Sequence, residues 1–136
     1  MITPGDLDTA ARTVWGEARG ESQEGRRAVA HVLVNRWRAD GGVFARDATL
    51  TQAATRHRQF SSWNPDDPNL QAMQKVTLNN AEFRACMRAV LESVDSIHDP
   101  TFGSKHYHAS HVSPDWAKGH GPAAHVGAHV FYSDIS

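Results

Sequence analysis

The stretch Val14-Trp15-Gly16-Glu17-Ala18-Arg19-Gly20-Glu21 marks the point at which an apolar helix gives way to glycines. Thr3 is a residue type that caps helix N-termini, and Gly20 is a type that ends helices. Apolar residues between them recur at helical spacing and predict one buried face: Leu7, Ala11, Val14 and Ala18. Glu17 lies beside this face, where apolar surroundings keep a carboxylic acid protonated near neutral pH. The stretch therefore predicts a helix that ends in a candidate proton donor at the edge of a cleft.

Helical patterns continue downstream of this stretch. Ser22 caps a second predicted helix over about residues 23–38. Residues 80–97 give the clearest helix, and its expected apolar face consists of Phe83, Met87, Val90, Leu91, Val94 and Ile97. Short helices are expected within 43–58 and over 70–76. The first hundred residues therefore predict a mainly helical body.

The chain changes character after Pro100, where Gly, His, Tyr and Val replace helix-forming residues. Segments 104–109 and 128–133 predict two strands, which we expect to pair antiparallel across a long loop. Segment 60–69 holds two prolines and several Asx-type turn residues, so it predicts a non-helical loop of fixed shape. We expect a mainly α fold of the α+β kind, in which one domain over residues 1–136 carries a small antiparallel β element near its C-terminus.

Composition and charge exclude several classes of function. The 136 residues carry a formal net charge of -1 without a long block of like charges, so we expect no nucleic-acid partner. No apolar run reaches transmembrane length, and residues 1–6 lack the basic and apolar regions of a signal peptide. Cys86 is the sole cysteine and lies on a predicted apolar helix face, which indicates an inert buried thiol. We expect a monomer that is synthesised in the cytoplasm and does not insert stably into a membrane.

Aromatic and hydroxyl side chains of segment 60–69 are candidates for a saccharide site. Phe60 and Trp63 can pack against the C–H faces of sugars, and Ser61 can hydrogen-bond an N-acetyl group. Either aromatic residue can instead attach the loop to the core, and we favour Ser61 and Trp63 for the cleft and Phe60 for packing. Cleavage of a glycosidic bond needs a proton on the leaving oxygen, which Glu17 would supply; the alternative for Glu17 is a solvated position at a helix end.

Histidines of the C-terminal segments allow a second interpretation. His106 and His108 alternate, so both face one side of a strand, and His129 could join them from the neighbouring strand. Three histidines and a water form the zinc site of some hydrolases, although no H-E-x-x-H motif occurs here. In the other interpretation, Tyr107 or His108 binds the substrate or orients Glu17.

Short motifs follow one another along nearly the whole chain. The opening motif Trp15-Gly16-Glu17-Ala18-Arg19-Gly20-Glu21 precedes Ala28-Val29-Ala30-His31-Val32-Leu33-Val34-Asn35-Arg36. The later motifs are Gln59-Phe60-Ser61-Ser62-Trp63-Asn64, His106-Tyr107-His108, Pro114-Asp115-Trp116 and Gly127-Ala128-His129-Val130-Phe131-Tyr132. In this order and spacing they resemble the SleB-type cell-wall hydrolases, a family of spore-cortex-lytic enzymes and related phage and prophage endolysins.

The resemblance implies a lysozyme-like, mainly helical fold and an enzyme that degrades peptidoglycan. It implies cleavage of the glycan strand between N-acetylmuramic acid and N-acetylglucosamine, as a lytic transglycosylase that leaves a 1,6-anhydromuramic acid end. Glu17 matches the family's catalytic acid, and no cofactor or metal is implied. Glu21, the nearest second carboxylate, is a more natural structural partner for Arg36 or another nearby arginine than a nucleophile. The side chains expected to bind substrate are Glu21, Phe60, Ser61, Trp63, Tyr107, His108, Trp116, His129 and Tyr132.

The sequence also departs from the spore enzymes, which carry a signal peptide and a separate wall-binding module. That difference favours the endolysin or prophage branch, in which the enzyme leaves the cytoplasm through a partner pore and acts on the wall in the periplasm. Two other functions stay open at this point. One is a zinc-dependent N-acetylmuramoyl-L-alanine amidase, and the other is a non-catalytic module that binds glycan strands.

Overall fold

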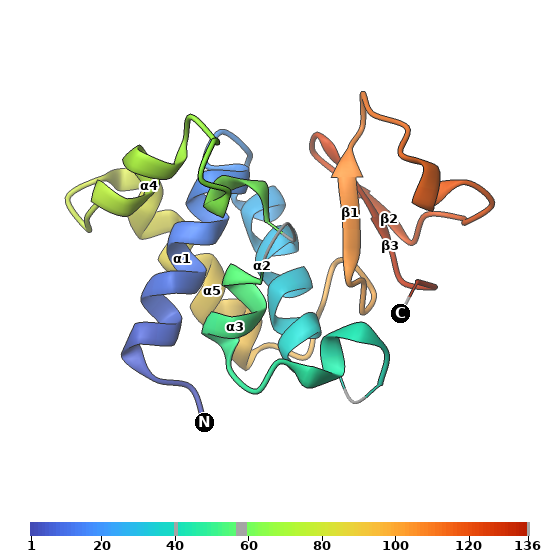
Figure 1. Ribbon diagram of the computed structural model, residues 1–136, viewed down its shortest axis with the longest axis horizontal. Coiled ribbons are helices and arrows are strands. Elements are labelled where there is room, and N and C mark those ends of the chain that lie inside the picture. Colours follow the sequence, from blue (N-terminus) through green and yellow to red (C-terminus); the bar gives the residue numbers. More distant parts are fainter. Residues whose placement is uncertain (40, 57–59, 136) are drawn as a thin grey trace.

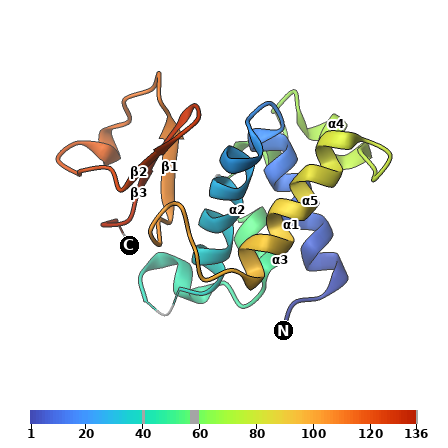
Figure 2. The same ribbon diagram turned by 180° about the vertical axis from the view of Figure 1, so that it is seen from behind.

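A computed structural model describes residues 1–39, 41–56 and 60–135, and Figures 1 and 2 show a body of packed helices beside a small sheet. The α-helices are α1 (Pro4–Ala18), α2 (Gln23–Trp37), α3 (Leu50–Thr55), α4 (Leu70–Lys75) and α5 (Ala81–Asp95). The 3-10 helices are η1 (Val43–Arg46), η2 (Ser61–Trp63) and η3 (Asp115–Ala117). The strands are β1 (His106–Ala109), β2 (Ala124–Val126) and β3 (His129–Tyr132). The arrangement confirms the predicted mainly α fold with an antiparallel sheet near the C-terminus.

Side-chain caps start the long helices where the sequence places them. Thr3 caps α1, Ser22 caps α2 and Asn80 caps α5, and each accepts a backbone N–H of the first helical turn. A cap of this kind satisfies a donor that the start of a helix leaves without a partner. The helix boundaries are therefore set by local chemistry that can be read from the sequence.

The core lies where α1, α2 and α5 pack against one another. Their buried faces follow the predicted spacing, except that Leu91 is half-exposed and Ile97 lies beyond the end of α5, where it is 92% exposed. Cys86 is buried as predicted, and burial raises the pKa of its thiol to about 12. Among the described residues, no helix is both long and apolar enough to cross a membrane.

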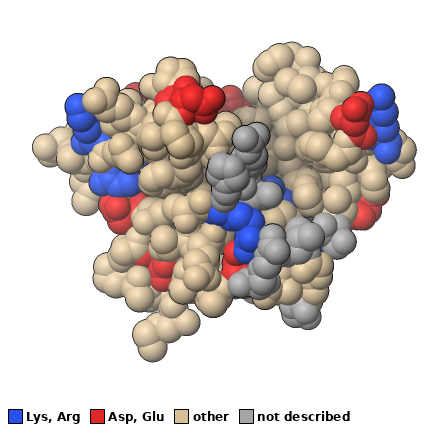
Figure 3. Space-filling model, in the orientation of Figure 1, with Lys and Arg blue, Asp and Glu red and all other residues tan. Residues whose placement is uncertain are grey.

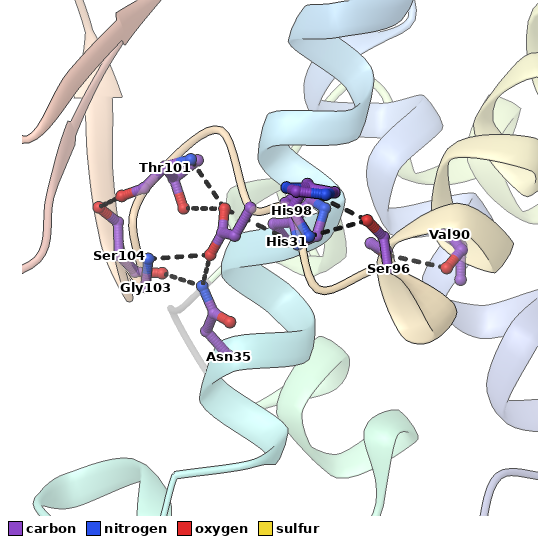
Figure 4. A network of polar contacts seen from close by, with 10 residues as sticks. His31, Asn35, Val90, Ser96, His98, Thr101, Gly103 and Ser104 are labelled. Carbon is purple, nitrogen blue, oxygen red and sulfur yellow. Dashed lines mark hydrogen bonds and ion pairs between the residues drawn. The ribbon is translucent and has the colours of Figure 1, made fainter.

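A polar network attaches the segment between α5 and β1 to helix α2 (Figure 4). Asn35 Nδ2 donates to Asp99 Oδ2 (2.7 Å) and to the Ser104 carbonyl (3.0 Å), and His31 Nδ1 lies 3.7 Å from Asp99 Oδ1. Burial acts to raise the pKa of Asp99, but hydrogen bonds from Asn35 and Thr101 outweigh it, and the net pKa is lowered. The network thereby places the start of β1 against the helical body.

The sheet has the order β1-β3-β2, and both strand pairs are antiparallel. Tyr107 pairs with Phe131, which is fully buried, so this face of the sheet packs on the helical body. The strands β1 and β3 confirm the two predicted strands, whereas β2 lies in a segment that was expected to be a loop. β2 is too short to show alternation in the sequence; Gly127, with a φ of 57°, forms the turn that pairs β2 with β3.

Candidate active site

Glu17 lies in the last turn of α1, half-buried, and its carboxyl group contacts two other elements. The Tyr107 hydroxyl of β1 donates to Glu17 Oε1 at 2.9 Å. Oε2 accepts the Ser62 backbone N–H at 3.2 Å and is also hydrogen-bonded by the Ser62 hydroxyl of η2. The Ser61 hydroxyl is 3.4 Å from the same oxygen, which makes a weaker contact. Groups from the sheet and from η2 therefore fix the direction of this carboxyl group.

The position of η2 depends on packing on both sides of Ser62. Phe60 is only 1% exposed and belongs to the core, and Trp63 Nε1 donates to Thr13 Oγ1 of α1 at 2.8 Å. A Cβ atom on Gly16 would lie 2.6 Å from Ser62 Oγ, so the absence of a side chain lets Ser62 approach α1. Phe60, which was also named as a substrate-binding candidate, thus packs in the core, as the favoured alternative had it. The indole of Trp63, which was favoured for the cleft, attaches η2 to α1.

Tyr107 is held between aromatic neighbours of β3. Its ring stacks on Phe131 at a centroid distance of 5.6 Å and meets the edge of the His129 ring at 5.0 Å. Burial, together with the nearby charge of Glu17, raises the pKa of Tyr107 well above its ordinary value. Tyr107 is therefore a neutral hydroxyl that can donate to the carboxylate.

Glu21 holds the turn between β2 and β3. Its Oε1 accepts the Ala128 N–H at 2.8 Å and lies 3.6 Å from His129 Nδ1. Burial lowers the pKa of His129, although the charges of Glu21 and Glu17 oppose that effect. A Cβ on Gly127 would lie 2.5 Å from Glu21 Oε1, so glycine is needed for space as well as for its backbone angle. The carboxylate of Glu21 thus connects the end of the first helix to the sheet.

Arg36, one of the arginines expected as a partner of Glu21, does not pair with it. It is 4% exposed, and its Nε donates to the Lys105 carbonyl at 2.7 Å. The guanidinium lies 4.6 Å from the ring centroid of Phe44 and 4.8 Å from that of Phe60. Burial lowers the pKa of Arg36 to about 10, so the side chain stays charged at neutral pH. The sequence contained one indication, because Arg36 lies at helical spacing from the apolar residues Val29, Val32 and Leu33 of the predicted helix 23–38.

The other face of the sheet carries a separate aromatic cluster. His108 Nε2 is hydrogen-bonded to the Tyr132 hydroxyl at 2.9 Å, and Trp116 packs against both rings at 5.5–5.6 Å. Because Tyr107 and His108 are adjacent in a strand, they point to opposite faces, and only Tyr107 reaches Glu17. The structure therefore places His108, Trp116 and Tyr132 away from the residues that hold Glu17.

The three-histidine arrangement considered for zinc is not formed. His129 pairs with Ala109 and contacts Tyr107, which puts it on the opposite sheet face from His106 and His108. Within 1–39, 41–56 and 60–135, no group of three His, Cys, Asp or Glu side chains is arranged to hold a metal ion. The zinc site that the amidase interpretation requires is therefore absent from the described residues.

An open groove of about 450 Å³ runs between the end of α1 and the sheet. Figure 3 shows the surface hollowed between the helical body and the sheet, at the upper edge of that view. Polar side chains on the groove are those of Glu17, Arg19, Glu21, Asn69, His111 and His129. Sequence reasoning missed Arg19 and Asn69, which are joined by a 2.7 Å hydrogen bond from Arg19 Nη2 to Asn69 Oδ1. Gln59, which belonged to the predicted central loop, lies outside the described residues.

Comparisons with known proteins relate this chain to cell-wall hydrolases. The family model described as Cell Wall Hydrolase matches residues 20–132, a range that begins after Glu17. The catalytic domain of the Bacillus cereus SleB protein is 23% identical, with a TM-score of 0.76, over 97% of this chain and 92% of that one. The catalytic domain of the germination-specific lytic transglycosylase SleB from Bacillus anthracis is 24% identical, with a TM-score of 0.72, over 96% and 95% of the two chains. Both structures share the fold, and no curated protein matches the chain.

Proposed function

Since the chain belongs to the cell wall hydrolase family, we propose that it is a lytic transglycosylase that cleaves peptidoglycan glycan strands, with Glu17 as the proton donor. One observation supports this most directly. The Glu17 carboxyl group lies at an open groove and is fixed by donors from β1 and η2. A carboxyl group held in this way can be aimed at a bond of a polymer that lies along the groove.

The proposed reaction needs a single carboxyl group. Glu17 gives its proton to the glycosidic oxygen between N-acetylmuramic acid and N-acetylglucosamine, and the C1–O bond breaks through an oxocarbenium-like state. The 6-hydroxyl of the muramic acid then adds to C1 and returns its proton to the Glu17 carboxylate. Tyr107 and Ser62 donate to that carboxylate while it carries the charge. The products are a 1,6-anhydro end and a free 4-hydroxyl on the departing sugar.

The state of Glu21 supports transglycosylation over hydrolysis. A hydrolase of the usual kind needs a second carboxylate as a nucleophile or as a base for water. Glu21 lies on the same groove, but its Oε1 already accepts the Ala128 N–H. Attack by the substrate's own hydroxyl avoids the need for this second group.

The groove also suggests which side chains contact the glycan. We propose that Ser61, Tyr107, Glu21 and His129 stay in the substrate site, because they contact Glu17 or lie on the groove. Arg19, Asn69 and His111 add polar groups along the same groove. We no longer propose Phe60, His108, Trp116 or Tyr132 as substrate-binding residues. Phe60 lies in the core, and the other three form a cluster on the opposite face of the sheet from Tyr107.

Mass spectrometry of digested, purified peptidoglycan tests the proposal. Wild-type protein should release fragments with anhydromuramic acid ends, each lighter by one water than a reducing end. Glu17→Gln keeps the size and one acceptor oxygen but cannot supply the acidic proton, so it should release no fragments while circular dichroism stays unchanged. Retained activity of this variant would reject Glu17 as the proton donor, and reducing ends would indicate a hydrolase.

The same experiment separates the alternative functions. An amidase would release free peptides and stop in the presence of a metal chelator, whereas the proposed enzyme should work unchanged in EDTA. If the chain were a non-catalytic module, both the wild type and Glu17→Gln would bind glycan strands, and neither would release fragments from peptidoglycan. An endolysin-like role, with release through a partner pore, stays a prediction of the resemblance alone.

A further inference from the structure

Arg36 is buried next to both segments that hold Glu17, and we propose that it is a positioning residue for proton transfer by Glu17. The proposal rests on the glycosidase function proposed above. It assigns two tasks to one guanidinium group. Its contacts fix the segments that carry the donors to Glu17, and its charge stabilises the Glu17 carboxylate that proton transfer leaves behind.

The contacts of Arg36 lead to each donor by a short path along the chain. Its Nε donates to the Lys105 carbonyl, directly before β1, and Tyr107 follows within that strand. Its guanidinium also lies against the ring of Phe60, directly before η2, which carries Ser62. A shift of Arg36 would therefore move the donors on both oxygens of Glu17 at once.

The charge of Arg36 has few other partners. Burial lowers the pKa of Arg36, and interactions with Tyr107 and with the carboxylates of Glu17 and Asp47 oppose that effect. Asp47 is already paired with Arg56, whereas the groups that donate to Glu17 are neutral hydroxyl and amide groups. Within the described part of the chain, Arg36 Nη1 is buried and has no hydrogen-bond partner. The Glu17 carboxylate is therefore one of the charges that the buried Arg36 cation can stabilise.

A buried charge acts strongly because little solvent screens it. The Glu17 carboxylate forms as the proton moves to the leaving sugar, so a fixed cation nearby lowers the energy of that state. Fixed charges and dipoles around a developing charge are often a large part of catalysis. A tether alone would not have this electrostatic effect, and the two roles can therefore be separated by experiment.

Two substitutions at Arg36 and one control separate charge from attachment. Arg36→Gln removes the charge but can still donate to the Lys105 carbonyl, whereas Arg36→Lys keeps the charge. The matched control is Asn35→Ala, which removes a donor to the adjacent Ser104 carbonyl from the same helix, as Figure 4 shows, without changing any charge. Thermal denaturation identifies the variants that fold, and all comparisons use folded protein.

The first measurement is a titration of the Glu17 carboxyl by carbon NMR, with its signal assigned by its loss in Glu17→Gln. In Arg36→Gln the midpoint should rise by about one pH unit, because removal of a nearby cation disfavours the carboxylate. In Asn35→Ala and Arg36→Lys, the Glu17 carboxyl should titrate with the same midpoint as in the wild type. An unchanged midpoint in Arg36→Gln overturns the proposal; if that variant does not fold, a raised midpoint in Arg36→Lys overturns it.

The second measurement is the rate of cleavage of soluble glycan fragments. Arg36→Gln should lower kcat by about ten-fold or more with KM changed less than about three-fold, since a transition-state interaction is lost. In Arg36→Gln, the alkaline limb of the dependence of kcat on pH should move to higher pH. In Arg36→Lys, that dependence should match the wild type. If Arg36→Gln and Asn35→Ala had the same dependence of kcat on pH, Arg36 would act only by holding the adjacent segments in place, and the proposed role of its charge would be rejected. If the wild type cleaves no glycan, the proposed function fails, and the titration still decides the role of Arg36.

Discussion

The contacts of Glu17 show how a flexible carboxyl group acquires one direction. Its Oε1 is bound by the Tyr107 hydroxyl, and its Oε2 by the backbone and side chain of Ser62. Ser62 is 2% exposed, whereas Ser61 is exposed and contacts the same oxygen at 3.4 Å. The two neighbouring serines therefore have different environments: the buried Ser62 orients Glu17, whereas Ser61 is exposed to solvent.

This difference predicts unequal effects of removing the two hydroxyls. Ser62→Ala should lower kcat by about ten-fold, because a hydrogen bond to a charged group is worth about 1.5–3 kcal/mol and about 1.4 kcal/mol is a factor of ten. Ser61→Ala should change kcat by less than about three-fold, since its contact is long. Steady-state rates on soluble glycan fragments measure both. A larger loss in Ser61→Ala than in Ser62→Ala would contradict this assignment.

At the scale of elements, helix α2 holds the segment that leads into β1. His31 is 2% exposed, and its Nδ1 lies 3.7 Å from Asp99 Oδ1 (Figure 4). Burial lowers the pKa of His31, the charges of Arg27 and Arg38 add to this, and Asp99 opposes it. The folded protein thus favours the neutral imidazole, and this preference makes the attachment of the segment sensitive to acid.

We therefore expect stability to fall as the pH drops below the ordinary His value of 6.5. In that window the unfolded chain binds a proton at His31 that the folded protein does not, so acid favours unfolding. His31→Gln should show a flatter dependence of the free energy of unfolding on pH between about 8 and 5. Urea denaturation at each pH measures it. The control is His125→Gln at an exposed position, which should keep the wild-type slope; equal slopes in all three proteins would refute the role of His31.

At the scale of the whole molecule, the groove exists because the sheet is held beside the end of α1 (Figure 1). Glu21 makes the connection through its hydrogen bond to the Ala128 N–H in the turn between β2 and β3. His129 follows this turn and lies on the groove. One carboxylate on the groove therefore holds the turn from which His129 extends.

Two substitutions at Glu21 distinguish this connection from a catalytic role. Glu21→Gln keeps an acceptor for the Ala128 N–H, so we expect activity within about three-fold of the wild type. Glu21→Ala removes the acceptor, and activity should fall by about ten-fold, since a hydrogen bond to a charged group is lost. Hydrogen exchange at Ala128 should become faster in the Ala variant alone. If the Gln variant were as inactive as the Ala variant, the charge of Glu21 itself would be required.

Several residues show why part of the site could not be predicted. Adjacent residues of a strand point to opposite faces, and the pattern of His106-Tyr107-His108 does not reveal which face meets the helices. Tyr107 and His108 were therefore equal candidates, and packing selected Tyr107. Phe60 and Trp63 were likewise ambiguous, because an aromatic ring suits a core and a saccharide rim equally well.

The long helices, their N-terminal caps and the position of Glu17 near the end of α1 could be predicted from local patterns, because these features depend on residues within a turn or two of one another. The tertiary structure alone decided which groups meet Glu17 and Glu21. Ser62, Tyr107 and Ala128 are far from these two residues along the chain, and they come together only when the helical body and sheet pack. Those encounters depend on the burial of the whole core, and no local pattern of residues encodes them.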